Sequence, residues 1–296
     1  MFPRFEQQLQ QRRQRLERNL NHYLAMLPAI NTQLATVINY GVLSGGKRLR
    51  ALLLYSVGDC LLLPFEQLDA PATAVECLHA YTLLHDDLPA MDNSPLRRGK
   101  PTAHIKFGEG LAILAGDALQ AIAFSILSQP FVESISPSTQ LAMLQELAAT
   151  SHGLCHGQAL DLQVTSATTL LPETLTQIHY YKTALLIRCA VRLAVFAASP
   201  PILDQLPDFD QFSTALGLAF QLQDDILDVT TDTQQLGKPQ GHDQQCGKAY
   251  WHAANLTIAK QQLQQLYQTA FQNLKRLPYN TLPLQIFADY LQNRVY

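Results

Sequence analysis

The chain has 296 residues, 47% of them hydrophobic and 15% charged, a length that favours one or two domains. Lys and Arg number 21 against 24 Asp and Glu, so the formal net charge of −3 argues against a protein that coats nucleic acid. The five cysteines are scattered and form no CxxC pair, which argues against a zinc site or a disulfide framework and favours reduced thiols.

The N-terminal segment is polar and charged and lacks the apolar core of a signal peptide. The apolar stretch from Ala51 to Phe65 is interrupted by Asp59 and is too short to span a bilayer. We therefore expect a cytoplasmic protein with no stable membrane insertion and no nucleic-acid partner.

Apolar residues recur at three- and four-residue spacing along most of the chain, which predicts helices. The predicted helical runs are Leu9–Leu24, Ala72–Leu84, Leu111–Leu127, Leu141–Leu154, Leu175–Ala198, Phe212–Val229 and Ile258–Leu274. Proline and glycine cluster between the runs, and no segment has the composition of a linker. We expect one all-α domain over residues 1–296, with about ten helices around one core.

The segment GGKRLR (45–50) combines two glycines with three cations at the expected start of a helix. Glycines let a backbone approach an anion closely, and a helix N-terminus favours negative charge. The same combination is common in ordinary helix starts, so this segment carries weight only together with others.

Three carboxylates, Asp86, Asp87 and Asp92, follow the apolar run AVECLHAYTLL. A carboxylate in apolar surroundings is costly unless it is paired, hydrogen-bonded or bound to a metal. Asp86 and Asp92 are six residues apart and would point away from each other on a regular helix. Because Pro89 bends or ends a helix, we expect the chain to swing Asp92 back toward Asp86.

A second acidic cluster, Asp224, Asp225 and Asp228, lies inside the apolar run ALGLAFQLQDDILDV. Asp224 and Asp228 are one turn apart on the same helical face, where two like charges repel. That helix offers no compensating Lys or Arg nearby, so a divalent cation is the natural partner. All-oxygen ligands suit Mg²⁺, which commonly takes one or two carboxylates plus substrate phosphates and waters.

Cationic and polar residues accompany both clusters. Arg97 and Arg98 follow the first, and arginine forks suit phosphate oxygens. Lys182 lies in the apolar run IHYYKTALLIRCAV, where an ordinary explanation is a lysine that extends its amine to solvent. His79 precedes Asp86 by seven residues, and Gln221 precedes Asp224 by three.

Taken singly, these features have ordinary structural explanations, such as a solvated loop or a hydrogen-bonded core histidine. Taken together, they describe a site where metal ions bridge carboxylates to one diphosphate while cations hold a second. A basic, glycine-containing loop that includes Lys238 follows the second cluster.

The ordered blocks GGKRLR, LLHDDLPAMD with LRRGKPTAH, GDAL, GQALDL, YKTALL, FQLQDDILD and LGKPQGHD resemble the polyprenyl synthase family, and most of all the bacterial farnesyl diphosphate synthases. The blocks run from about residue 39 to 251. The resemblance implies the isoprenoid synthase fold, a helical bundle around a deep central cavity, and a homodimer. It also implies head-to-tail condensation of isopentenyl diphosphate with dimethylallyl or geranyl diphosphate.

The resemblance assigns roles to individual residues. The first motif, with Asp86 and Asp92 as metal ligands, would join Asp224 in holding several Mg²⁺ ions, or Mn²⁺, on the allylic diphosphate. The resemblance implies that the same diphosphate is bound by Arg97, Lys182 and Lys238. Isopentenyl diphosphate would be bound by Lys47, Arg50, His79 and Arg98. Thr183 and Gln221 would direct oxygen dipoles at the reacting carbon.

Product length depends on the residues before the first motif. In this family a bulky aromatic there stops chain growth early, so Tyr81 favours a C15 product over a C20 geranylgeranyl product. Two further hypotheses are a non-catalytic subunit that binds prenyl diphosphates, which would usually lack part of an aspartate motif, and a terpene cyclase, which would not need Lys47, Arg50 and Arg98.

The sequence departs from the family pattern in three places. Asn93-Ser94-Pro95 replaces a further acidic run, and Ala249-Tyr250-Trp251 replaces a frequent Thr-Tyr pair. His156 occupies a position that is often small. None of these departures removes an expected ligand.

Overall fold

The computed structural model describes residues 2–26, 30–130, 132–164, 172–198, 202–230 and 255–294. Most of these residues are helical, and the strands among them are the two-residue β1 (Leu96–Arg97) and β2 (Lys100–Pro101), which pair as a small hairpin. The all-α prediction is confirmed. The chain divides into two compact units, so a single domain over residues 1–296 stays a prediction.

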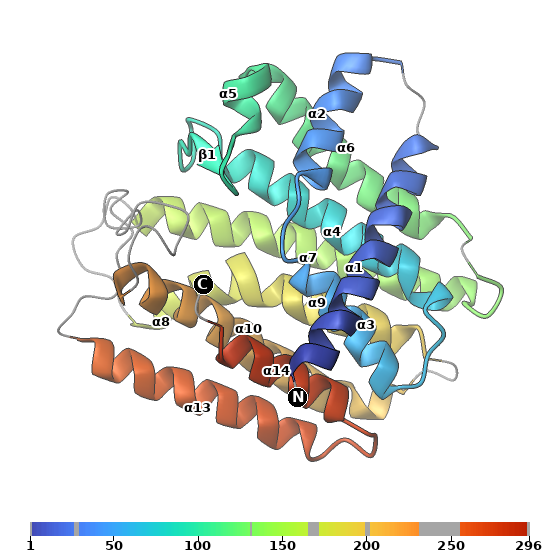
Figure 1. Ribbon diagram of the computed structural model, residues 1–296, viewed down its shortest axis with the longest axis vertical. Helices are drawn as coiled ribbons and strands as arrows, with labels where there is room; N and C mark the ends of the chain where they lie inside the picture. The colour runs from blue at the N-terminus through green and yellow to red at the C-terminus, as the bar shows by residue number, and fades with distance from the viewer. Residues whose placement is uncertain are drawn as a thin grey trace. The chain divides into compact units, whose positions relative to one another are not determined.

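The first unit comprises Met1–Ala148 and Leu193–Pro201. Its helices are α1 (Phe2–Ala25), α2 (Thr32–Leu43), α3 (Leu49–Cys60), α4 (Glu66–Asp86), α5 (Ala103–Phe107) and α6 (Glu109–Ser128), with the first part of α7 (Pro137–Val164) and the end of α9 (Leu185–Phe196). Helix α4 packs against α6, α3, α2 and α1 (Figure 1). Because it has helical neighbours on several sides, α4 is apolar nearly all round, as expected of a central helix.

The second unit comprises Ala149–Arg192 and Ile202–Tyr296. It contains the end of α7, α8 (Pro172–His179), the π-helical turn η1 (Tyr180–Ala184), the start of α9, the short 3₁₀ turn η2 (Leu203–Gln205), α10 (Leu206–Thr230), α13 (Leu256–Leu274) and α14 (Leu282–Gln292). Helix α10 packs along α13 and against η1 (Figure 1). Leu222 and Ile226 of α10 are buried against Ala259 of α13.

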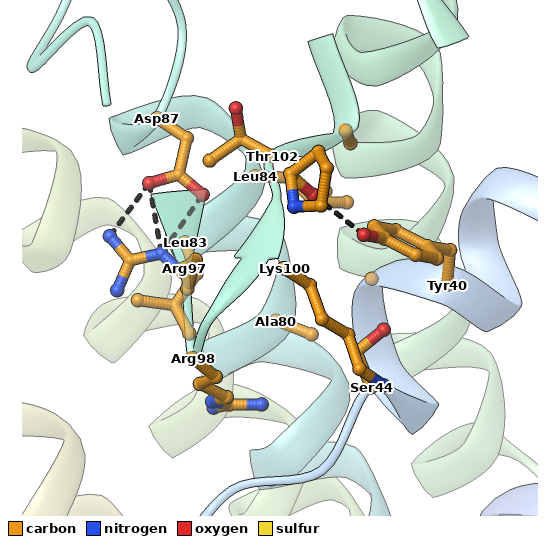
Figure 2. Close-up of a pocket in the computed structure, with 13 residues that line it drawn as sticks. Tyr40, Ser44, Ala80, Leu83, Leu84, Asp87, Arg97, Arg98, Lys100 and Thr102 are labelled. Carbon is orange, nitrogen blue, oxygen red and sulfur yellow. Dashed lines mark hydrogen bonds and ion pairs between the residues drawn. The ribbon is translucent and has the colours of Figure 1, made fainter. Parts of the chain in front are cut away.

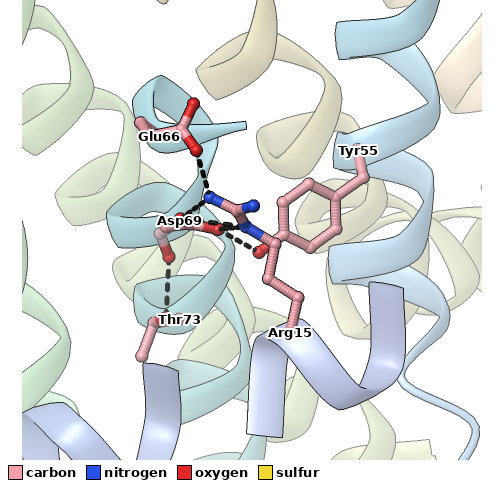
Figure 3. Close-up of polar contacts among 5 residues, drawn as sticks. All are labelled: Arg15, Tyr55, Glu66, Asp69 and Thr73. Atoms are coloured by element: carbon pink, nitrogen blue, oxygen red, sulfur yellow. Dashed lines mark hydrogen bonds and ion pairs between the residues drawn. The ribbon is translucent and has the colours of Figure 1, made fainter. Parts of the chain in front are cut away.

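Within the first unit, a polar network joins α1 to α3 and α4 (Figure 3). Arg15 donates to both carboxylate oxygens of Asp69 on α4, at 2.7–3.1 Å, and to Glu66 at 2.7 Å. The hydroxyl of the fully buried Tyr55 on α3 donates to the same Asp69 at 2.7 Å. Asp69 therefore connects three helices.

The predicted run Leu175–Ala198 forms three consecutive helical pieces, α8, η1 and α9. A π-helical turn contains one more residue than an α-helical turn, and apolar spacing alone does not reveal it. Helices α2, α3 and α14 are 11 or 12 residues long and were not among the predicted runs.

Helix α6 is long and apolar enough to cross a membrane by length and composition, and about half of it is buried within the chain. A core helix of a globular protein passes the same test. Its outward side carries the exposed residues Ile113 and Leu114.

Candidate active site

The first acidic cluster lies where α4 ends. The helix terminates at Asp86, and the following residues fold back so that the backbone N–H of Asp92 donates to the carbonyl of Asp86 at 2.9 Å. Asn93 adopts a left-handed conformation with φ of 47° within this turn. The predicted return of Asp92 toward Asp86 is confirmed at the level of the backbone.

Asp87, between these two residues, is buried and paired with Arg97 (Figure 2). The Arg97 Nε lies 2.8 and 2.9 Å from the two carboxylate oxygens, and a second guanidinium nitrogen lies 2.7 Å from Oδ1. Burial raises the pKa of Asp87, although the arginine opposes that shift. Asp87 thus fixes Arg97 beside the first motif, a structural role that the sequence did not indicate.

The glycines of GGKRLR bring Arg98 onto this loop. Gly45 and Gly46 have φ of 90° and 124°, and the Arg98 guanidinium donates to the Gly45 carbonyl. A Cβ atom at Gly46 would lie only 2.5 Å from the guanidinium carbon, so a side chain there would displace Arg98. The glycines therefore permit a close approach by a cation of the same chain, in addition to any approach by an anion.

His79 of α4 contacts Arg50, another cation of GGKRLR. Its Nε2 is 3.1 Å from Arg50 Nη1, and because a guanidinium can only donate, Nε2 must accept and Nδ1 must carry the proton. Burial and the positive charges of Arg50, Arg98, Arg97 and Arg48 lower the pKa of His79 well below its ordinary value. Burial and the neighbouring arginines also lower the pKa of Arg98 to about 10.

Arg48 differs from its neighbours in GGKRLR. It is buried, ion-paired with Glu76 of α4 at 3.3 Å, and donates to the carbonyl of Val42. Lys47 is exposed instead. Of the three cations of the segment, Arg48 therefore has a structural contact, and the binding role of Lys47 and Arg50 stays a prediction.

A cavity of about 40 Å³ adjoins this region between α2, α4 and the β1–β2 hairpin (Figure 2). Apolar residues of α4, including Leu83 and Leu84, line one side, and Asp87, Arg97 and Lys100 contribute charged groups. Tyr40 of α2 donates to the Pro101 carbonyl at 2.6 Å and holds the hairpin against α2.

In the second unit, two glycines determine where η1 lies. A Cβ at Gly157 of α7 would come within 2.6 Å of the Lys182 backbone nitrogen, and one at Gly217 of α10 within 2.5 Å of Ala184 Cα. Both clashes are with backbone-linked atoms that cannot rotate away. The π turn that carries Lys182 and Thr183 is therefore in close contact with both helices, and π turns occur often at functional sites.

These contacts arrange a chain of polar side chains. Lys182 Nζ lies 2.7 Å from the buried carboxylate of Asp161 on α7. Thr183 donates to Gln221 at 2.7 Å, and Gln221 donates to Asp225 at 2.9 Å. Asp225 lies 3.0 Å from His179 Nε2. The structure thus brings together Lys182, Thr183 and Gln221, three of the predicted site residues.

The second aspartate motif lies on α10, as predicted, with Asp228 buried and Asp224 42% exposed at its side chain. Asp224 is ion-paired at 2.6 Å with Arg294, whose guanidinium also stacks on Phe220 at 3.8 Å from the ring centre. This cation is on a different segment of the chain from α10. Arg294 lies seventy residues further along the chain, so no local pattern could reveal it.

Two further predictions concern single positions. Tyr81 lies on α4 with its ring 5.0 Å from that of His85, and His85 fits against the Cβ-free position Gly116 of α6. Lys238 lies outside the described residues. Asp161, which pairs with Lys182, was not among the predicted site residues, although a carboxylate in the apolar block GQALDL indicates a cationic or hydrogen-bonding partner.

The donor chemistry of both motifs fits a hard divalent cation. Asp86, Asp92 and Asp224 offer oxygen ligands only, and Mg²⁺ usually relies on one or two carboxylates completed by waters and substrate phosphates. Within the described residues no three His, Cys, Asp or Glu side chains form a cluster that could hold a metal ion by themselves. Metal binding that is completed by a phosphorylated substrate agrees with this arrangement.

Comparisons with known proteins agree with these observations. The farnesyl diphosphate synthase of Escherichia coli strain K12 is 47% identical over 296 residues, which covers 98% of this chain and 99% of that protein. The farnesyl diphosphate synthase of Haemophilus influenzae is 42% identical and covers 98% of both.

Solved structures also resemble this one. A geranyltransferase from Legionella pneumophila has a TM-score of 0.86 at 31% identity, with 98% of this chain and 96% of that chain covered. A geranyltransferase from Helicobacter pylori in complex with magnesium and isoprenyl diphosphate has a TM-score of 0.82 at 32% identity, with 96% and 95% covered. A model of the family described as polyprenyl synthetase matches residues 31–280, and the chain belongs to that family.

Proposed function

We propose that the chain condenses isopentenyl diphosphate with dimethylallyl or geranyl diphosphate and releases farnesyl diphosphate and diphosphate. The observation that carries this proposal is the group of arginines around His79, next to the carboxylates that end α4. Concentrated positive charge beside oxygen ligands suits diphosphate and magnesium. The relatives named farnesyl diphosphate synthase support the same activity.

The allylic diphosphate is proposed to bind through Mg²⁺ held by Asp86, Asp92 and Asp224, with Mn²⁺ as a second suitable ion. A metal ion held by these carboxylates would supply Lewis-acid chemistry that stabilises the charge of the diphosphate leaving group. Arg97, Lys182 and Lys238 would contact the same diphosphate. Asp87 and Asp161 orient Arg97 and Lys182 by the ion pairs described above.

The carbon that becomes cationic is proposed to face Thr183 and Gln221. The Thr183 hydroxyl donates to Gln221, so its own oxygen lone pairs remain oriented away from that bond. Fixed dipoles in a site shielded from water stabilise a developing charge more strongly than mobile water does. The π turn fixes Thr183 before the reaction begins.

Isopentenyl diphosphate is proposed to bind to Lys47, Arg50, His79 and Arg98. The Arg50 bond leaves the Nδ1–H of a neutral His79 as the available hydrogen-bond donor. The bound alkene would attack the allylic carbon, and the released diphosphate would accept the proton that ends the step. Tyr81 limits the growing chain in this proposal and favours a C15 product.

The decisive experiment supplies the purified chain with Mg²⁺, geranyl diphosphate and isopentenyl diphosphate. We expect release of diphosphate and a C15 product by chromatography, and loss of turnover in Asp86→Ala and Asp224→Ala with unchanged helix content by circular dichroism. A chain that binds both substrates without releasing diphosphate would instead be a binding subunit. A C20 majority would disprove the role given to Tyr81.

We also propose a cytoplasmic homodimer. The exposed residues Ile105 on α5 and Ile113 and Leu114 on α6 are apolar and close in sequence. Large exposed apolar side chains grouped on neighbouring elements often mark a protein–protein interface.

A further inference from the structure

Two histidines on α7 have no role in the proposed reaction. His152 and His156 are exposed and four residues apart, so they lie on the same helical face. Their Nε2 atoms are 3.1 Å apart, and their rings stand at 82° to each other with centres separated by 4.5 Å. His156 is also the position at which this sequence departs from the small residue frequent in the family.

The distance between the two nitrogens matches a shared metal ion. Zinc–imidazole bonds are about 2.0–2.1 Å long, and two such bonds that meet at about 90–109° separate their nitrogens by about 2.9–3.4 Å. We propose that His152 and His156 form a two-imidazole chelate for a divalent transition metal. Imidazole suits Zn²⁺, Ni²⁺ and Cu²⁺, whereas Mg²⁺ prefers oxygen, so this site is chemically distinct from the aspartate motifs.

The surroundings determine what kind of site this is. Within the described residues no third His, Cys, Asp or Glu completes a cluster with the pair. We therefore assign the remaining coordination positions to water as far as the described part of the chain is concerned, which would make the ion exchangeable. Because both imidazoles must be neutral to bind, occupancy falls as the pH is lowered.

The site is next to residues that support Lys182. Gly157, which directly follows His156, contacts the Lys182 backbone, and Asp161 one turn further pairs with its amine. An ion on His152 and His156 would therefore bind to the turn of α7 that precedes these contacts.

The test is calorimetric titration of the untagged chain with Ni²⁺ in the presence of excess Mg²⁺. We expect one ion per chain and a loss of affinity of at least about tenfold in His152→Asn and in His156→Asn, because even an outer-shell partner of a metal ligand is worth about 10–100-fold. His22→Asn is the matched control, since His22 is exposed on α1 and has no histidine four residues away. Cys155→Ser tests the exposed thiol beside the pair.

Binding that survives in both variants, or that is lost equally in His22→Asn, would place the ion on other histidines and overturn the proposal. Loss in Cys155→Ser would assign a thiolate ligand and overturn the two-imidazole set. One ion per two chains would indicate a site shared between copies. If the unaltered chain bound Ni²⁺ no tighter than about 1 mM, the two rings would be joined by a hydrogen bond only.

Discussion

The arginines around His79 carry the same charge but make different contacts. Arg48 is buried against Glu76, Arg97 is fixed by Asp87, and Arg50 donates to His79. Arg98 contacts the glycine loop and has a lowered pKa because it is partly desolvated among other cations. A bound anion would relieve that repulsion.

Substitution of Arg98 tests the assignment of the second substrate. Arg98→Ala should raise KM for isopentenyl diphosphate by about tenfold or more, since a charge-assisted hydrogen bond contributes about 1.5–3 kcal/mol. KM for the allylic diphosphate should change much less in the same steady-state assays. An equal increase for both substrates would contradict the assignment.

The lowered pKa of His79 predicts a dependence of stability on pH. Below about pH 6.5 this histidine is protonated in the unfolded chain but not in the folded chain, because its folded pKa is lowered. Its contribution to the free energy of unfolding is therefore complete above that pH and is lost as the pH falls through the lowered folded pKa. The loss is at most about 1.4 kcal/mol per pH unit. Urea unfolding at pH 7.5 and 5.5 should show less acid destabilisation in His79→Gln than in the unaltered chain. Equal losses in the two proteins would refute this.

At the scale of elements, the π turn η1 carries two predicted site residues. It occupies its place because Gly157 and Gly217 let α7 and α10 approach its backbone, while Asp161 and Gln221 bind its side chains. Its position therefore depends on groups from two other helices.

Gly157→Ala should disturb this arrangement. The added methyl group meets backbone at 2.6 Å, and such overpacking typically costs about 1–3 kcal/mol. Turnover should fall as well, because Lys182 shifts with η1. Gly110→Ala on α6 is the control, since nothing lies within 4 Å of its added Cβ and alanine is the better helix former. Thermal unfolding and turnover should be measured on both variants. If Gly157→Ala kept the stability and turnover of the unaltered chain, η1 could shift to make room for the methyl group without loss of function.

At the scale of the whole molecule, stability depends on contacts that join sequence-distant helices. Asp69 is central in the first unit because Arg15 and Tyr55 both donate to it (Figure 3). Burial also raises the pKa of Tyr55, so the phenol remains a donor over the ordinary pH range.

Asp69→Asn should lower the free energy of unfolding by about 2 kcal/mol, because it removes the partner charge of Arg15 and replaces one of the two oxygens that accept from Arg15 with an amide donor. Glu66→Gln removes the charge of the other Arg15 partner, which is an exposed carboxylate, so it should cost less than about 1 kcal/mol. Urea unfolding compares the two variants. Equal effects would mean that burial does not determine the value of these ion pairs.

Assembly of the molecule can be tested on α6. Leu114→Asp introduces a charge at an exposed apolar position and should shift the chain from dimer to monomer in sedimentation experiments. The control is a polar substitution at Leu62, an exposed residue after α3 that is outside the proposed interface. A monomeric unaltered chain would remove the dimer proposal.

The helical class, the family and the chemical character of both aspartate motifs could be predicted from the amino-acid sequence. These properties are local, since helical periodicity and a carboxylate in an apolar run can be recognised within a few turns. The return of Asp92 toward Asp86 was also predictable, because Pro89 acts on its own neighbourhood.

The ion-pair partners of these charged residues could be identified only from the folded structure. Arg294 pairs with Asp224, Asp161 with Lys182, and Glu76 with Arg48 across 21 to 70 residues of sequence. The π turn and the close approach at Gly157 likewise depend on how helices pack. An ion pair forms where two side chains meet in space, and the spacing of residues along a single helix carries no information about a partner on another.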